Sequence, residues 1–184
     1  MAKSILVLLA KGFEEIEAVS IIDVCRRGGI NVCTAGVEEL LVLGANRITV
    51  AADCLLADVQ NDDFDMVVLP GGLGGTNILA TNEMVQNLLK KFKQNDKHIG
   101  AICAAPIALD KAGVLSDNFT CYPSCETNIS KQGYNDTKKV IIDGKIITSR
   151  GPATAICFGL AIVEQLEGKE TAAMIQGGML ADFC

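Results

Sequence analysis

The sequence contains no tryptophan and few other aromatic residues, although nearly half of its 184 residues are apolar. A core of this composition must be built mainly from Ala, Val, Ile and Leu, the usual filling of a parallel sheet covered by helices. A chain of this length suits one domain with a sizeable core. We therefore expect residues 1–184 to form a single domain.

Long basic runs and long apolar runs are also absent. The net charge is −6 and no basic run exceeds "LKKFK" at 89–93, so a phosphate-binding surface for nucleic acid is not expected. No stretch approaches the ~18 apolar residues of a membrane span. The apolar run at 5–10 is shorter than the roughly 7–15 residues of a signal-peptide core, and charged residues follow it. We expect a cytoplasmic protein with neither nucleic-acid nor membrane partners.

The eight cysteines show no metal-site spacing. "CYPSC" at 121–125 has two cysteines but no further ligand cluster, so zinc is not expected. In a cytoplasmic chain of this size, the cysteines are expected to stay reduced and to serve mostly as small apolar side chains. Those expected inside strands or helices fit this role: Cys25, Cys33, Cys54 and Cys157.

Short apolar runs alternate with helical patterns along the chain. Buried strands are expected at 4–10, 30–36, 64–72 and 98–103, and hairpins at 39–53 and 138–149. Helices are expected at 14–29, 82–96, 104–113 and 152–168, with a last helical segment at 169–180. This order predicts a doubly wound, flavodoxin-like α/β domain, with a mainly parallel sheet and helices on both faces.

In such folds the functional groups gather at the carboxyl edge of the sheet. The segments expected there are "AKGFEEIE" after the first strand, "PGGLGG" at 70–75, and Cys103 after "HIGAI". We expect these three segments to converge. "PGGLGG" lacks the spacing of a nucleotide-binding loop and the Walker lysine. It either supplies backbone amides to an oxyanion or forms only a tight turn.

Cys103 lies where an expected strand passes directly into an expected helix, among small residues. This pattern resembles a nucleophile elbow, and a helix N-terminus favours a thiolate with a lowered pKa. The alternative is a buried structural cysteine. His98 is the only histidine, and five strand residues place it about 16 Å away. A Cys-His hydrolase is therefore disfavoured.

The remaining proton-handling candidates are three acids that follow the first strand, Glu14, Glu15 and Glu17. Glu14 and Glu15 are expected in the exposed first turn of a helix, with Glu17 three residues after Glu14. Any of the three could face the sheet, because all lie near the strand end. Each could also be an ordinary first-turn acid that interacts with the helix dipole.

Several segments together resemble the ThiJ/PfpI superfamily, specifically its Parkinson-disease-protein (DJ-one) branch: "LAKGFEEIE", "DVCRRGGI", "VVLPGG", "GAICAAP", "ITSRGPATA" and "GLAIVEQLEGKE". They cover nearly the whole chain in the order that the family has. The resemblance implies that Cys103 is a reactive elbow cysteine that oxidises readily to sulfinate, and that Glu17 hydrogen-bonds it. It implies a homodimer that needs no metal or cofactor. It also implies that the backbone of Gly71, Gly72 and Ala104 lines the site. Arg47 and Arg150 match arginines near the dimer interface and the pocket.

The chain departs from the Parkinson-disease protein at two positions. Tyr122 precedes Pro123 where that protein has a histidine, and Ala105 replaces a glycine. A histidine-assisted mechanism is thus unavailable. Tyr122 can line the pocket and donate a hydrogen bond, but it is a poor base near neutral pH.

The resemblance favours a glutathione-independent glyoxalase that converts methylglyoxal or glyoxal to a 2-hydroxy acid through a cysteine hemithioacetal, with a related protein deglycase activity. The alternative is an oxidative-stress sensor or redox-regulated chaperone that acts through oxidation of Cys103. A cysteine amidase or peptidase is a third possibility, which the missing histidine disfavours.

Overall fold

All strands of the central seven-stranded sheet except β10 run parallel to their neighbours. The computed structural model describes residues 2–60 and 64–184. Across the sheet the strands are β10 (Val140–Asp143), β11 (Ile146–Ser149), β7 (His98–Ile102), β6 (Met66–Leu69), β1 (Ser4–Leu9), β2 (Asn31–Gly36) and β5 (Cys54–Leu55). This arrangement confirms the predicted mainly parallel sheet.

The strand order contains a topological switch point beside β1. From β1 the chain first goes to β2 on one side, and it later returns to β6 on the other side. In doubly wound sheets, a crevice opens outside the carboxyl ends of the strands at such a point. The flavodoxin-like prediction is confirmed, and the switch point lies between β1 and β6, with β7 next to β6.

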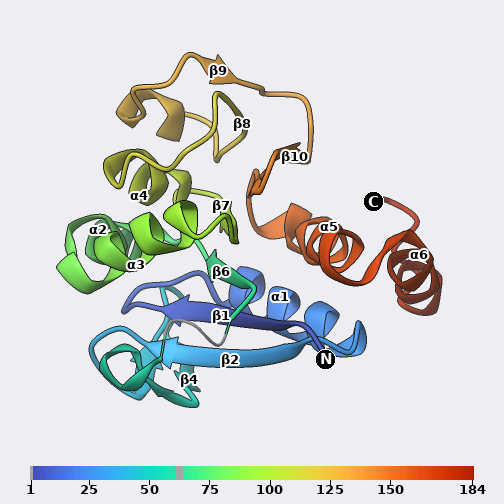
Figure 1. Ribbon diagram of the computed structural model, residues 1–184, viewed down its shortest axis with the longest axis horizontal. Coiled ribbons are helices and arrows are strands. Elements are labelled where there is room, and N and C mark those ends of the chain that lie inside the picture. The colour runs from blue at the N-terminus through green and yellow to red at the C-terminus, as the bar shows by residue number, and fades with distance from the viewer. Residues whose placement is uncertain (1, 61–63) are drawn as a thin grey trace.

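Helices cover both faces of the sheet (Figure 1). One layer contains α2 (Leu73–Thr81), α3 (Glu83–Gln94) and α4 (Pro106–Lys111), and the other contains α1 (Glu15–Arg27), α5 (Ala155–Glu167) and α6 (Lys169–Gly178). Successive strand residues point to opposite faces. In β1, Leu6 and Leu8 therefore enter the first core, whereas Ile5, Val7 and Leu9 enter the second.

Both expected hairpins are present. The first consists of β3 (Leu41–Leu43) and β4 (Thr49–Ala51), and the second joins β10 to β11 through Gly144. A further two-stranded sheet, β8 (Asn118–Phe119) with β9 (Gly133–Tyr134), has no counterpart among the expected elements. Short 3-10 helices lie at η1 (Leu56–Asp58), η3 (Cys125–Asn128) and η4 (Pro152–Thr154).

The helix α2 is also absent from the sequence-based expectation, because its first turn is rich in glycine. Glycine disfavours a helix interior, so "PGGLGG" is typical of a loop. The structure shows why a small residue is needed there. A Cβ atom added at Gly75 would lie 3.0 Å from the backbone nitrogen of Phe13. The glycines thus let α2 approach the turn that follows β1.

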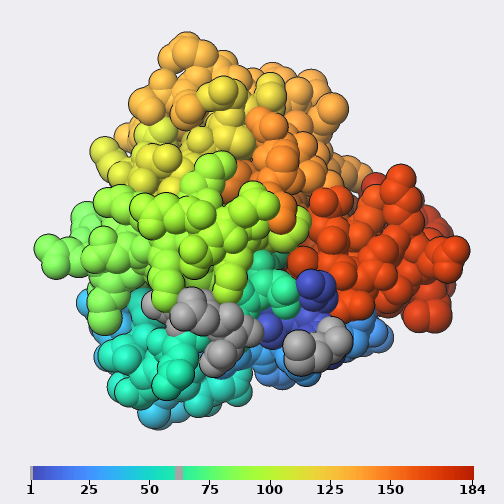
Figure 2. Space-filling view, in the orientation of Figure 1, coloured from blue at the N-terminus to red at the C-terminus, as the bar shows by residue number. Residues whose placement is uncertain are grey.

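One cysteine pair contradicts the expectation that all eight cysteines stay reduced. Cys157 in α5 and Cys184 at the end of the chain form a disulfide, with their Cα atoms 5.1 Å apart. A chain of this length does not need a disulfide for stability, but its length does not prevent one from forming. Helix α6 packs on α5 and returns the chain end to it, and Figure 2 shows these helices in red at one side of the molecule. The other six cysteines are free.

Candidate active site

Three segments meet at the carboxyl ends of β1, β6 and β7, and Gly71 lies at their centre. A Cβ atom added at Gly71 would lie 2.5 Å from Cβ of Cys103 and 2.7 Å from Oε2 of Glu17. Only glycine leaves room for this approach. The structure therefore brings together the acidic segment, the glycine segment and Cys103, as the sequence predicts.

Cys103 occupies a strained backbone conformation between β7 and α4. Its φ of 64° lies in the left-handed region, which few residues other than glycine adopt. Two hydrogen bonds hold it there: the Cys103 N–H donates to the Ser149 carbonyl at 3.0 Å, and the Tyr122 N–H donates to the Cys103 carbonyl at 2.8 Å. The residue is 8% exposed. This geometry is that of an elbow that presents its side chain at the end of the sheet.

The thiol is not acidified as the sequence pattern suggests. Burial and then the charge of Glu17 raise the pKa of Cys103 to about 12, although backbone N–H groups of Gly72 and Ala104 act to lower it. The expectation of a lowered pKa is therefore wrong. Helix α4 begins only at Pro106 and is six residues long. Its dipole is therefore too weak to offset the effect of burial on the pKa of Cys103.

Glu17 is fully buried beside this thiol. Burial raises the pKa of Glu17 to about 7, against hydrogen bonds from the Gly71 N–H and the Cys103 side chain, which lower it. The Gly71 N–H donates to Oε2 at 2.7 Å. Within the described part of the chain, Oε1 is buried without a regular hydrogen-bond partner. A proton on Oε1 would therefore be available to the site.

The two neighbouring acids have other partners. Glu14 caps α1, where its Oε2 accepts the N–H of Glu17 at 2.8 Å. Glu15 is buried rather than exposed as expected, and its carboxylate accepts hydrogen bonds from Asn46 and Ile48 in the β3–β4 hairpin. Of the three acids, Glu17 is the one directed at Cys103.

The expected pocket residues lie at different depths. Tyr122 is half exposed, and its ring covers Gly151, where an added Cβ atom would come within 3.1 Å of the ring. Arg150 directly follows Ser149, whose carbonyl holds Cys103. Arg47 is exposed in the β3–β4 hairpin with a φ of 68°. A role for these side chains in binding stays a prediction.

His98 begins β7 at the end of the strand opposite Cys103, as the strand pattern predicts. It is half-buried with a buried Nδ1 atom, not a surface residue. Residues 2–60 and 64–184 contain no group of three or more His, Cys, Asp or Glu residues able to hold a metal. Those ranges also contain no helix long and apolar enough to cross a membrane.

Two positions that the sequence does not single out complete the site. Gly12, with a φ of 84°, turns the chain after β1 so that the Glu14 N–H donates to the Gly71 carbonyl at 2.9 Å. Ser149 anchors Cys103 and is itself fixed by hydrogen bonds of its hydroxyl to Lys139 and Thr154. The sequence signals that could have identified them are weak. Gly12 is a glycine just after one strand, and Ser149 is a small polar residue at the end of another.

Comparison with known proteins agrees with this arrangement. A model of the DJ-1/PfpI family matches residues 3–165. The chain belongs to the DJ-1/PfpI family. It is 44% identical over its full length to "Protein dj-1beta" of Drosophila melanogaster, which it also covers completely, and 36% identical over 97% of both chains to the Danio rerio "Parkinson disease protein 7 homolog". These relatives place it in the DJ-1 branch.

Another DJ-1 relative, from Caenorhabditis elegans, has the name "Glutathione-independent glyoxalase DJR-1.2"; it is 39% identical over 91% of both chains. Among solved structures, Drosophila melanogaster DJ-1beta superposes with a TM-score of 0.94 at 44% identity over 98% of both chains. A Toxoplasma gondii structure, "DJ-1, oxidized", gives a TM-score of 0.92 at 36% identity, over 97% of this chain and 98% of that one.

Proposed function

We propose that this protein is a glutathione-independent glyoxalase that converts 2-oxoaldehydes such as methylglyoxal and glyoxal to 2-hydroxy acids. A related protein deglycase activity, on early adducts of these aldehydes, would use the same site. The observation that carries the proposal is the Glu17–Cys103 pair, in which a fully buried carboxyl group lies against a thiol on a strained elbow. The glyoxalase name of the Caenorhabditis elegans relative supports it.

The reaction begins when the Cys103 sulfur attacks the aldehyde carbon of methylglyoxal, while Glu17 takes up the thiol proton. The hemithioacetal oxygen would lie near the N–H groups of Gly72 and Ala104, which already point at the sulfur. Protonation of that oxygen completes the hemithioacetal.

A proton then moves from the former aldehyde carbon to the adjacent carbon through an enediol. This step oxidises the first carbon to a thioester and reduces the ketone to an alcohol, so no external electron carrier is needed. Water hydrolyses the thioester, which releases lactate and restores the Cys103 thiol. Glu17 is suited to both proton abstraction and proton return, because a group with a pKa of about 7 exists in both forms at neutral pH.

The test is to incubate the purified protein with methylglyoxal in the absence of glutathione and to measure lactate. We expect Cys103→Ala and Glu17→Gln to lose nearly all activity, and Cys54→Ser, which changes a thiol on the sheet edge, to retain it. If the wild type forms no more lactate than the two site variants, the glyoxalase proposal fails. Circular dichroism of each variant would check that the fold is intact.

A second candidate function, oxidant sensing or redox-regulated chaperone activity through Cys103, is supported by the same residue. Cys103 lies at the end of the sheet with 8% of the residue exposed, and a thiol that a small peroxide reaches is oxidised to sulfenic and then sulfinic acid. The Toxoplasma gondii relative of known structure is described as oxidized. Intact-mass analysis after mild peroxide treatment should show a two-oxygen adduct that Cys103→Ala abolishes. Absence of this adduct would count against a sensor.

We also propose that the protein is a homodimer. Helix α1 leaves Ile16 59% exposed and Val19 52% exposed, and the adjacent β3–β4 hairpin exposes Leu41 and Ile48. Apolar side chains gathered on the outer surface of one region favour burial against a second protein surface. This patch lies next to the first turn of α1, so a partner subunit there would border the site.

A further inference from the structure

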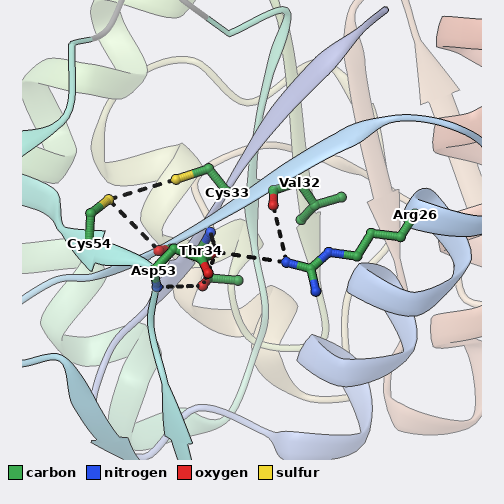
Figure 3. A network of polar contacts seen from close by, with 6 residues as sticks. All are labelled: Arg26, Val32, Cys33, Thr34, Asp53 and Cys54. Carbon is green, nitrogen blue, oxygen red and sulfur yellow. Dashed lines mark hydrogen bonds and ion pairs between the residues drawn. The ribbon is translucent and has the colours of Figure 1, made fainter.

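A second pair of cysteines lies at the edge of the sheet, outside the site described above. The sulfur atoms of Cys33 in β2 and Cys54 in β5 are 3.7 Å apart and face each other (Figure 3). Both side chains are partly exposed, so small solutes can reach them. The mechanism proposed above uses neither thiol.

The strand register places both thiols on one face of the sheet. Cys54 pairs with Ala35, and Cys33 lies two residues before Ala35 on the same strand. Because side chains alternate along a strand, residues two apart share a face. Both cysteines accordingly pack against the same core cluster. β5 has only two residues and is the last strand of the sheet, so it can shift more easily than an interior strand.

A polar network holds the two segments that carry the thiols (Figure 3). The carboxylate of Asp53, next to Cys54, accepts hydrogen bonds from the N–H of Thr34 at 2.8 Å and from its hydroxyl at 2.7 Å. Arg26 of α1 donates to the Val32 carbonyl at 3.2 Å and forms an ion pair with Asp53 at 3.8 Å. The residues that flank both cysteines are thus tied together, and this keeps the sulfur atoms adjacent.

We propose that Cys33 and Cys54 form a second redox site, in which a hydroperoxide converts the two thiols to an intramolecular disulfide. One thiol, as thiolate, attacks the peroxide oxygen to give a sulfenic acid and an alcohol, or water from hydrogen peroxide. The second thiol then attacks that sulfur and releases water. The two cysteines together lose two hydrogens, and the peroxide is reduced.

Closure requires the sulfur separation to decrease from 3.7 Å to about 2 Å, within reach of a small shift of β5. Burial and the neighbouring Cys54 thiol raise the pKa of Cys33 to about 12. The raised pKa makes Cys33 a poor thiolate near neutral pH. The close approach of the two sulfur atoms lets either thiol condense with the other once one of them is oxidised. The product would close a loop that contains the β3–β4 hairpin, whose Asn46 and Ile48 hold Glu15.

The experiment uses the full chain with Cys103→Ala, so that the elbow thiol does not react and the result does not depend on the proposed glyoxalase. The protein is reduced, treated with hydrogen peroxide, alkylated and digested with trypsin. Cys33 and Cys54 then fall in separate peptides, 28–47 and 48–90. We expect these peptides to be joined, at about 2 Da below their summed mass, and to separate when dithiothreitol is added.

Cys121 and Cys125 provide an internal comparison, because both are free and they lie four residues apart, although Cys121 is fully buried whereas Cys33 and Cys54 are partly exposed. They should be alkylated separately under the same conditions. Cys33→Ser should abolish the joined peptide and leave Cys54 alkylated or oxidised alone, with an unchanged melting curve. Separate alkylation of Cys33 and Cys54 after peroxide treatment would overturn the proposal. A cross-linked dimer on a non-reducing gel would overturn its intramolecular form.

Discussion

Glu17 should make the stability of this protein fall as the pH rises toward neutrality. Burial raises the pKa of Glu17 from 4.5 to about 7 in the folded protein. Below 4.5 both the folded and the unfolded chain hold this proton, and the contribution of Glu17 to stability is fully present. Above that pH the unfolded chain releases the proton while the folded chain keeps it, so stability is lost progressively until the pH passes about 7.

The size of this effect follows from the two pKa values. Each pH unit in the interval corresponds to about 1.4 kcal/mol, so the interval from 4.5 to about 7 corresponds to about 3 kcal/mol. This is a large fraction of the roughly 5–15 kcal/mol by which proteins are stable. The substitution Glu17→Gln keeps the shape of the side chain but removes the titration. We therefore expect the variant to lack this part of the pH dependence.

The measurement is the free energy of urea unfolding at about pH 5 and about pH 8. We expect the wild type to lose roughly 2 to 3 kcal/mol more than Glu17→Gln over this range. Burial lowers the pKa of His98. The contribution of His98 to stability is therefore lost as the pH falls, which is the opposite pH dependence to that of Glu17. His98 is present in both proteins, so the difference between them isolates Glu17. Equal losses in the two proteins would refute the reasoning.

Three further predictions, the first with a control variant, test other parts of the structure. Gly71→Ala would place a Cβ atom 2.5 Å from Cβ of the elbow cysteine; we expect loss of lactate formation and about 1–3 kcal/mol of stability. At Gly177 an added Cβ atom would have no neighbouring atom within 4 Å. Gly177→Ala should therefore retain both lactate formation and stability in the same lactate and urea assays. Cys157→Ser removes the disulfide to Cys184 and should lower the unfolding free energy by about 2–4 kcal/mol. Equal unfolding free energies for this variant and the unreduced wild type would contradict the prediction. Ile16→Glu should halve the mass measured by light scattering with an unchanged circular dichroism spectrum, and a persistent dimer would argue against α1 as the interface.

Much of the fold can be predicted from the sequence because its signals are local. The buried strands β1, β6 and β7 are continuous apolar runs, and α3 carries a strongly amphipathic pattern. Helix α2 could not be predicted, because the glycines that weaken its pattern are there for tertiary packing against the turn after β1. The bond between Cys157 and Cys184 likewise depends on how α6 folds back on α5, which local sequence does not specify.

The choice among the three acids shows a similar limit. Helix α1 begins at Glu15, with Glu14 as its cap. Residues two apart on a helix point in nearly opposite directions, so Glu15 faces the β3–β4 hairpin while Glu17 faces Cys103. A shift of the helix start by one residue would have changed this assignment. The sequence pattern does not define that start closely enough, and only the family resemblance singled out Glu17.

In the proposed mechanism, the lack of a histidine partner would not leave Cys103 inert, because Glu17 would hold the proton that the thiol loses. The raised pKa of Cys103 includes repulsion from an ionised Glu17 as its second cause, after burial. When the thiol proton moves to Glu17, the pair keeps its single negative charge and that repulsion disappears. The N–H groups of Gly72 and Ala104 then stabilise the thiolate. In the proposed mechanism, the reactive form, thiolate with carboxylic acid, would thus be reached without releasing a proton to solvent.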